Sequence, residues 1–158
     1  MLQKPWNSIS LQPRPNPPVQ GLSLTPNGPN PLGWHKLNTN ASIINGCTGA
    51  SGLLRDSNGN WIQGFSQPLG TTTVLMAELW ALWEGPCMAK QFNIHNLIVN
   101  VDSFDIVKLI TSSSTNRLTQ PLEAECRDVL QAFHQVQLTH CYREANQVVD
   151  SFAKMGSL

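Results

Sequence analysis

The most informative segment for the fold is a short apolar run that ends in a carboxylate and a hydroxyl, Leu97-Ile98-Val99-Asn100-Val101-Asp102-Ser103. Its β-branched residues favour a strand that is buried inside a sheet. A short helix is expected over residues 102–110, and Asp102-Ser103 provides the type of residues that cap a helix N-terminus. The run therefore predicts a carboxylate at the point where a buried strand ends. Capping of the helix is the alternative role for Asp102.

Three strands are expected before this run. The first covers Trp34 to Ile44, a turn follows at Gly46–Gly52, and Leu53-Leu54 opens the second strand. The segment Asp56-Ser57-Asn58-Gly59-Asn60 predicts a tight hairpin, because Asn-Gly readily adopts positive φ. The third strand is expected over residues 61–65. These three strands should be antiparallel.

Leucines at helical spacing predict a helix over residues 72–91. Pro86 should kink or interrupt it, because proline lacks the backbone N–H that the helix needs. After the strand at 97–101 come helices over 102–110 and 120–133, a fifth strand over 136–142 and a closing helix over 144–155. The predicted order is βββαβααβα, an α/β fold in which helices flank a five-stranded mixed sheet.

Residues 1–33 differ in composition from the rest of the chain, since they hold most of its eleven prolines. Such a segment cannot form a helix or a central strand, so we expect a flexible arm or linker. Residues 34–158 form the folded domain. At 158 residues the chain is long enough to bury one sizeable core.

Ten Lys and Arg balance ten Asp and Glu, and the calculated pI is about 6.9. No global basic field would attract a nucleic acid, so such binding must use a local patch. Cys47, Cys87, Cys126 and Cys141 lack the spacing of a zinc site and are expected to be reduced. We expect an intracellular monomer that has no membrane span or secretory signal. The sequence does not distinguish nucleus from cytoplasm.

The predicted topology brings one amide and several carboxylates together. Asn40 lies within the first strand, which can neighbour the strand that ends at Asp102, and Glu78 lies on the helix face expected to meet the sheet. Asp150 sits among apolar residues of the last helix. Carboxylates that converge in this way repel one another unless a cation binds. Mg²⁺ prefers such oxygen ligands, and two ions could together cleave a phosphodiester. Taken singly, each residue has a plainer role as a helix or strand residue.

Short motifs complete an ordered set: Lys36-Leu37-Asn38-Thr39-Asn40, Gly49-Ala50-Ser51-Gly52 with Arg55-Asp56, Ala77-Glu78-Leu79-Trp80-Ala81-Leu82, Val101-Asp102-Ser103, and Tyr142-Arg143-Glu144-Ala145-Asn146 with Asp150. From Trp34 to Gly156 the chain resembles a type 1 ribonuclease H domain, in particular the plant ribonuclease-H-like group associated with reverse transcriptases. The resemblance implies the ribonuclease H fold. It also implies a hydrolase, an endonuclease that cuts the RNA strand of an RNA–DNA hybrid with two Mg²⁺ ions, or Mn²⁺ in their place.

By this resemblance, Glu78, Asp102 and Asp150 match three of the family's four metal-binding catalytic carboxylates. Asn40 stands where the family has the Asp of Asn-Thr-Asp-Gly. An amide offers Mg²⁺ only a neutral oxygen, so the site is one negative charge short. The resemblance therefore implies a catalytic site that is impaired at Asn40.

The resemblance also implies contacts with nucleic acid. Gly49, Ala50 and Ser51 match the region where family members bring backbone close to the RNA strand and its 2′-hydroxyls. Asn146 is assigned to the same contact. Arg143 falls in the loop where family members use His or Arg to assist product release. His140, nearby on the fifth strand, is expected to be a packed strand residue.

Three functions stay open. The first is a ribonuclease H that retains activity. The second is a catalytically inactive domain that binds nucleic acid, or a retroelement remnant, which Asn40 and Pro86 favour. The third is a protein-interaction domain that keeps only the fold, which the zero net charge favours. Salt-dependent binding to a hybrid would separate the second from the third.

Overall fold

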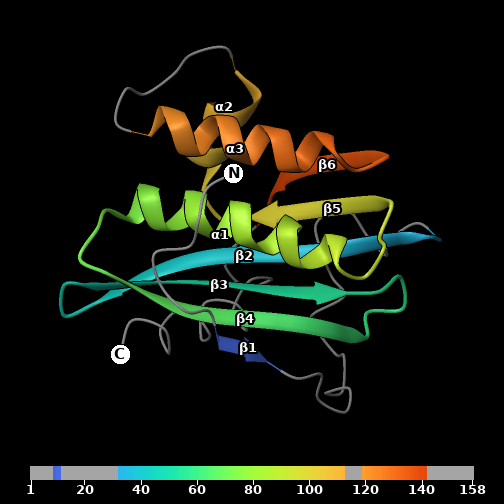
Figure 1. The fold of residues 1–158 in the computed structure, drawn as a ribbon, viewed down its shortest axis with the longest axis horizontal. Coiled ribbons are helices and arrows are strands. Elements are labelled where there is room, and N and C mark those ends of the chain that lie inside the picture. Colours follow the sequence, from blue (N-terminus) through green and yellow to red (C-terminus); the bar gives the residue numbers. More distant parts are fainter. Residues whose placement is uncertain (1–8, 12–31, 113–118, 142–158) are drawn as a thin grey trace.

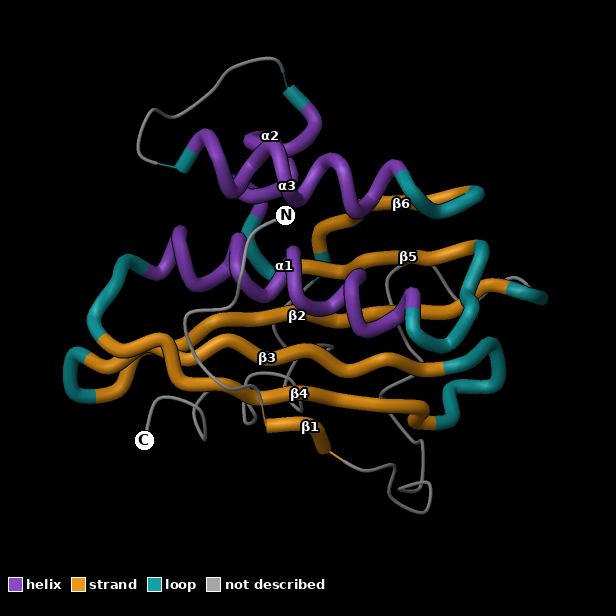
Figure 2. Tube along the Cα trace, in the orientation of Figure 1, coloured by secondary structure: helices purple, strands orange, loops and turns teal. Residues whose placement is uncertain are grey.

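The computed structural model describes residues 9–11, 32–112 and 119–141. The closing helix expected over residues 144–155 lies outside this part of the chain. The elements are β1 Ile9–Leu11, β2 Trp34–Ile44, β3 Cys47–Arg55, β4 Trp61–Gly70, α1 Val74–Lys90, β5 Asn96–Val101, α2 Phe104–Thr111, α3 Gln120–Gln131 and β6 Gln135–His140. They form one sheet with helices packed against it (Figures 1 and 2).

The sheet has the order β1-β4-β3-β2-β5-β6. Strands β2, β3 and β4 are antiparallel neighbours, whereas β5 runs parallel to β2 and β6 runs parallel to β5. The predicted five-stranded mixed sheet, with its first three strands antiparallel, is therefore confirmed. In addition, Ile9–Leu11 pairs antiparallel with β4 at the outer edge of the sheet.

The first hairpin differs from the sequence prediction. Asn45 and Gly46, with φ of 52° and 79°, form the turn, and β3 begins directly at Cys47. The turn predicted over Gly46–Gly52 is therefore wrong. Asn-Gly supplies the two positive φ values that a two-residue hairpin needs. The small residues that follow belong to the strand, where a side chain on Gly52 would collide with the ring of Phe65.

The second hairpin follows the prediction. The Asp56 carboxylate accepts hydrogen bonds from the backbone N–H groups of Asn58 and Asn60, each at 2.9 Å. Gly59 has a φ of 84°. The aspartate therefore closes the turn through its own side chain, as short polar residues often do in turns.

Helix α1 lies across β2 and β3 (Figure 1). Thr73 caps its N-terminus, where its hydroxyl accepts a hydrogen bond from the Met76 N–H at 3.1 Å. The helix continues through Pro86 to Lys90, so the predicted interruption is wrong. At Gly85 an added Cβ would lie 2.7 Å from Leu37 Cδ2. Glycine thus lets the helix approach β2 closely, and the packing of α1 on the sheet outweighs the local cost of the proline.

The core lies between this face of the sheet and the helices. Leu37, Leu79, Leu82, Leu97 and Val99 are fully buried there. Trp83 is 6% exposed and meets Trp80 edge-to-face at 5.6 Å, so it belongs to this core. None of the helices in the described ranges combines the length and the hydrophobicity needed to cross a membrane.

Candidate functional site

Asp102 follows β5 directly, and strand pairing places Asn40 beside it. The parallel pairing of β2 with β5 matches Thr39 with Val101, so Asn40 and Asp102 are the next residues along each strand. Asn40 is 3% exposed, and Asp102 is partly exposed. Because Leu37 and Thr39 face Gly85 of α1, alternation puts Asn40 on the opposite face of the sheet.

Glu78 lies in the first half of α1 and approaches Asp102 from the face of the sheet that α1 covers. Burial, and then the negative charge of Asp102, raise the pKa of Glu78 to about 7. Asp105 adds a smaller effect in the same direction, whereas a hydrogen bond with the Ser103 hydroxyl lowers the pKa. Two carboxylates thus lie near enough to disfavour each other's charge, which is the condition a cation relieves.

Ser103 joins this pair to helix α2. Its Oγ accepts a hydrogen bond from the Ile106 N–H at 3.4 Å and so caps the helix. The same hydroxyl interacts with Glu78. The capping role that the sequence predicted for Asp102-Ser103 therefore falls to Ser103. Asp102 is left to face the site.

The sheet face that carries Asn40 also holds charged groups. Lys36 and Arg55 are opposite each other on β2 and β3, and both are buried. Burial and the charge of Arg55 lower the pKa of Lys36 to about 8, and burial lowers the pKa of Arg55 to about 10. Burial and Asp102 raise the pKa of the Cys141 thiol to about 11. This face thus brings cations and a thiol close to Asp102.

The sequence did not reveal a group of side chains that surrounds the end of β6. His140 is exposed, its Nε2 lies 3.2 Å from the Asp102 carbonyl oxygen, and its ring meets Phe104 edge-to-face at 5.8 Å. The Lys108 ammonium lies 4.9 Å from the centre of the Phe104 ring, which is 54% exposed. The prediction that His140 is a packed strand residue is therefore wrong. The position of β6 beside β5 produces this contact, and no local sequence pattern predicts it.

The remaining predicted site residues divide into two groups. Asp150, Arg143 and Asn146 lie outside the described residues. Gly49, Ala50 and Ser51 lie within β3, where Ala50 and Ser51 are fully buried, and their contact with RNA stays a prediction. Within residues 9–11, 32–112 and 119–141, no group of three or more His, Cys, Asp or Glu is arranged to hold a metal ion.

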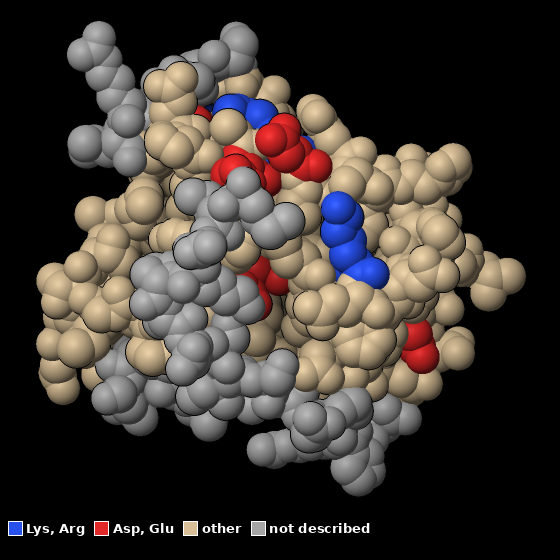
Figure 3. Space-filling view, viewed as in Figure 1, with Lys and Arg blue, Asp and Glu red and all other residues tan. Residues whose placement is uncertain are grey.

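The surface charge agrees with the neutral composition. On the face shown in Figure 3, acidic and basic side chains of the described residues lie interspersed, without a broad basic field.

A family model described as Reverse transcriptase-like matches residues 38–156. The chain belongs to the reverse transcriptase-like family. This span includes Asn40, Glu78, Asp102 and Asp150, so all four positions lie inside the family domain. The assignment rests on the matched length, which covers most of the chain.

A relative of this reverse transcriptase-like domain is a protein of Arabidopsis thaliana named "Putative ribonuclease H protein". The two are 37% identical over 125 residues, which is 77% of this chain and 20% of the relative. The chain thus spans about a fifth of that protein's length. Together with the family match, this relative confirms the predicted ribonuclease H domain of the plant type.

Solved structures confirm the fold of this reverse transcriptase-like domain. RNase H1 from Halobacterium salinarum superposes with a TM-score of 0.72 at 18% identity, over 78% of this chain and 96% of the other. The N-terminal RNase H domain of Rv2228c from Mycobacterium tuberculosis gives 0.74 at 16% identity, over 78% and 93%. LC11-RNase H1, in complex with an RNA/DNA hybrid, gives 0.71 at 18% identity, over 78% and 96%.

Proposed function

We propose that this domain binds RNA–DNA hybrids at the site around Asp102, and that hydrolysis of the RNA strand is strongly weakened by Asn40. The observation that carries the proposal is the pair formed by Glu78 and Asp102. A half-buried glutamate whose strongest charge interaction is with another carboxylate is unfavourable in isolation, and burial together with that repulsion raises its pKa to about 7. Perturbed carboxylates of this kind occur preferentially at functional sites.

The residues present fit a divalent cation in part. Glu78 and Asp102 provide two carboxylates whose mutual repulsion Mg²⁺ would relieve, and Asp150 would provide a third. When bound, Mg²⁺ or Mn²⁺ would activate a water molecule and stabilise the charge on the leaving oxygen. The role of the chain's own residues would be to hold the ions and to position the scissile phosphate beside Asn40 of β2 and the end of β5.

Asn40 weakens this site through charge rather than shape. The amide has nearly the size of the aspartate that the family motif carries, and its strand position beside Asp102 is retained. It offers one neutral oxygen, whereas a carboxylate adds a full negative charge. Because Mg²⁺ gives up its water reluctantly, losing one charge among its ligands lowers its occupancy sharply.

Cleavage of a labelled hybrid by the natural protein and by Asn40→Asp tests the proposal. We expect Asn40→Asp to cleave at least about 100-fold faster in Mg²⁺, corresponding to roughly 3 kcal/mol of the barrier. Glu78→Gln in both backgrounds supplies the control, because it removes a ligand without changing size. Comparable rates for the two proteins would show that Asn40 does not impair the site. Cleavage by neither would leave binding as the function.

Asn40 also favours a second candidate, a domain that binds hybrids without cleaving them. Such binding would depend on phosphate contacts, so its affinity should fall steeply with salt. An electrophoretic titration at several salt concentrations distinguishes it from a protein-interaction domain, which would show no saturable hybrid binding.

A further inference from the structure

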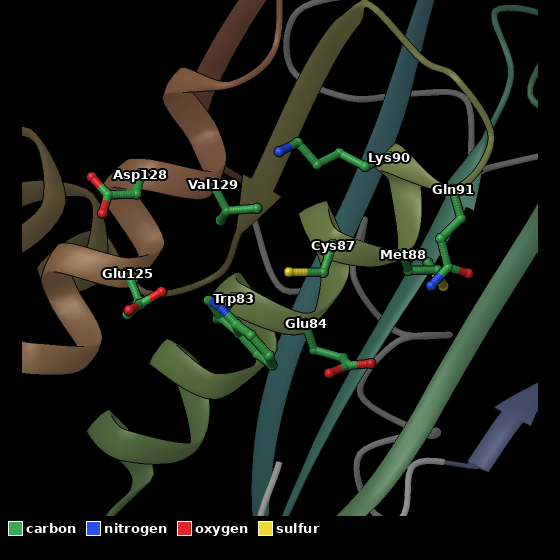
Figure 4. A pocket seen from close by; sticks show the side chains of 9 residues that line it. All are labelled: Trp83, Glu84, Cys87, Met88, Lys90, Gln91, Glu125, Asp128 and Val129. Atoms are coloured by element: carbon green, nitrogen blue, oxygen red, sulfur yellow. The ribbon is translucent and has the colours of Figure 1, made fainter. Parts of the chain in front are cut away.

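A groove of about 470 Å³ lies between α1 and α3 (Figure 4). Trp83, Cys87 and Lys90 project from successive turns of α1 on one side. Glu125 and Val129 point toward them from α3, and Asp128 lies on the outer rim of α3. The volume falls in the range of ligand-binding pockets, which is about 300–1,000 Å³.

The floor of the groove is apolar and its rim is acidic. Trp83 and Val129 are 6% and 9% exposed, so each presents only a small apolar surface to the groove. Glu125 and Asp128 on α3 carry the negative charge of the rim, against the lining cation Lys90, whereas Glu84 also lines the groove but is only 5% exposed. Acidic side chains also gather over α3 in Figure 3. An occupant must therefore combine positive charge with an apolar portion, and the acidic rim would repel the phosphates of a nucleic acid.

We propose that the α1–α3 groove docks a segment of a partner protein that presents an arginine beside an apolar residue. A guanidinium pairs with carboxylates through its planar fork. Glu125 and Asp128 supply the carboxylates, and the apolar floor at Trp83 and Val129 receives the apolar residue. Lys90 stands on the α1 side, so its charge directs the arginine toward α3.

The length of the groove favours a peptide over a small amine. Its α1 wall runs from Trp83 to Gln91, about 12 Å at 1.5 Å per residue. An extended peptide covers that length with about four residues, since each adds roughly 3.3 Å. The residues that line the groove do not include Glu78 or Asp102, so docking does not require the Asp102 site. A partner could remain bound whether or not the domain cleaves a hybrid.

Calorimetric titration of the full chain with an acetylated, amidated peptide of alternating leucine and arginine tests the proposal. We expect saturable one-to-one binding, weakened about tenfold or more in the double variant Glu125→Gln/Asp128→Asn, because charged hydrogen bonds are lost. Asp105→Asn, which removes an exposed carboxylate on α2, should bind like the natural protein. Thermal melts of the variants verify that each is folded.

Five outcomes would overturn the proposal. Absence of saturable binding, or equal affinity in the double variant, would remove the groove as the site. Equal binding of the same peptide with glutamine in place of arginine would show that the cation is not recognised. Equal binding of spermidine would indicate a small amine as the ligand. A dimer in sedimentation that the double variant abolishes would make a second copy of this chain the occupant.

Discussion

Two glutamates in this domain show how differently a protein can bury a carboxylate. Glu123 on α3 is fully buried, yet its Oε2 accepts a hydrogen bond from the Thr119 hydroxyl at 2.5 Å, and its Oε1 lies 3.5 Å from an Arg127 nitrogen. Glu78 on α1 is less buried, but its main charged neighbour is the acidic Asp102. The sign of the partners' charge, rather than the depth of burial, separates these two carboxylates.

The partners of Glu123 come from its own helix and tie that helix to its neighbour. Arg127 donates hydrogen bonds from Nε to the Ile110 carbonyl at 3.1 Å and from Nη2 to the Leu109 carbonyl at 2.7 Å. These carbonyls lie at the C-terminal end of α2, where a cation also interacts favourably with the helix dipole. The network therefore connects α2 and α3 and stabilises the fold without a metal ion.

The largest effect should come from Glu123→Gln. The amide cannot accept hydrogen bonds from both Thr119 and Arg127, so a buried donor loses its partner, at a cost of about 1–3 kcal/mol. Urea denaturation should show this loss of stability with an unchanged denaturant slope. Arg127→Met, which keeps the side-chain length, should lower stability in the same direction. A loss below about 0.5 kcal/mol, within the range of ordinary surface substitutions, would mean that the network contributes little.

Replacing Glu78 with Gln should change the free energy of unfolding in the opposite direction. Its pKa rises from 4.5 to about 7 on folding, so between these values the folded chain holds more protons than the unfolded chain. Stability therefore falls as pH rises through this window, and the cost is fully present above pH 7. Glu78→Gln should raise the free energy of unfolding by about 1–2 kcal/mol there, allowing for partial exposure. Denaturation of both proteins across this pH range measures it, and a destabilised variant would contradict the prediction.

Sequence patterns predicted the carboxylate pair because local rules govern each part. The β-branched run before Asp102 indicated a buried strand, and helical spacing placed Glu78 toward the sheet. The prediction that Asn40 lies close to Asp102 required only that their two strands be adjacent. The parallel pairing of β2 with β5 confirms that adjacency. The ordered motifs of the ribonuclease H domain added the chemistry that these rules do not supply.

Long-range packing explains what the sequence did not reveal. Gly49 to Gly52 has the composition of a turn, yet the approach of Phe65 on β4 makes glycine necessary inside a strand. Pro86 breaks helices locally, yet α1 continues because Gly85 lets it pack tightly on Leu37. His140 faces solvent only because β6 forms the edge of the sheet, next to Asp102.

A smaller effect should distinguish the two glutamates by their response to metal. Binding of Mg²⁺ or Mn²⁺ at the proposed site would stabilise the folded state by mass action. The ion should therefore raise the free energy of unfolding by roughly 1 kcal/mol and the melting temperature by a few degrees. Glu78→Gln should abolish most of this shift, whereas Glu123→Gln should lower the starting temperature and retain the shift. Differential scanning fluorimetry with added EDTA as the reference measures both. A shift that survives Glu78→Gln would place the cation elsewhere.

The smallest effect should come from His140→Ala. The imidazole lies 3.2 Å from the Asp102 carbonyl oxygen and against the Phe104 ring, so it helps to hold the turn that carries Asp102. Because His140 is exposed, its loss should cost less than about 1 kcal/mol of stability. The Mg²⁺-induced shift should nevertheless decrease about twofold, since Asp102 becomes less well positioned while Glu78 keeps its place. His140→Gln, which can still donate a hydrogen bond, should restore the shift. If both variants respond to Mg²⁺ like the natural protein, then β5 and Ser103 alone position Asp102, and the contact from β6 has no part in the site.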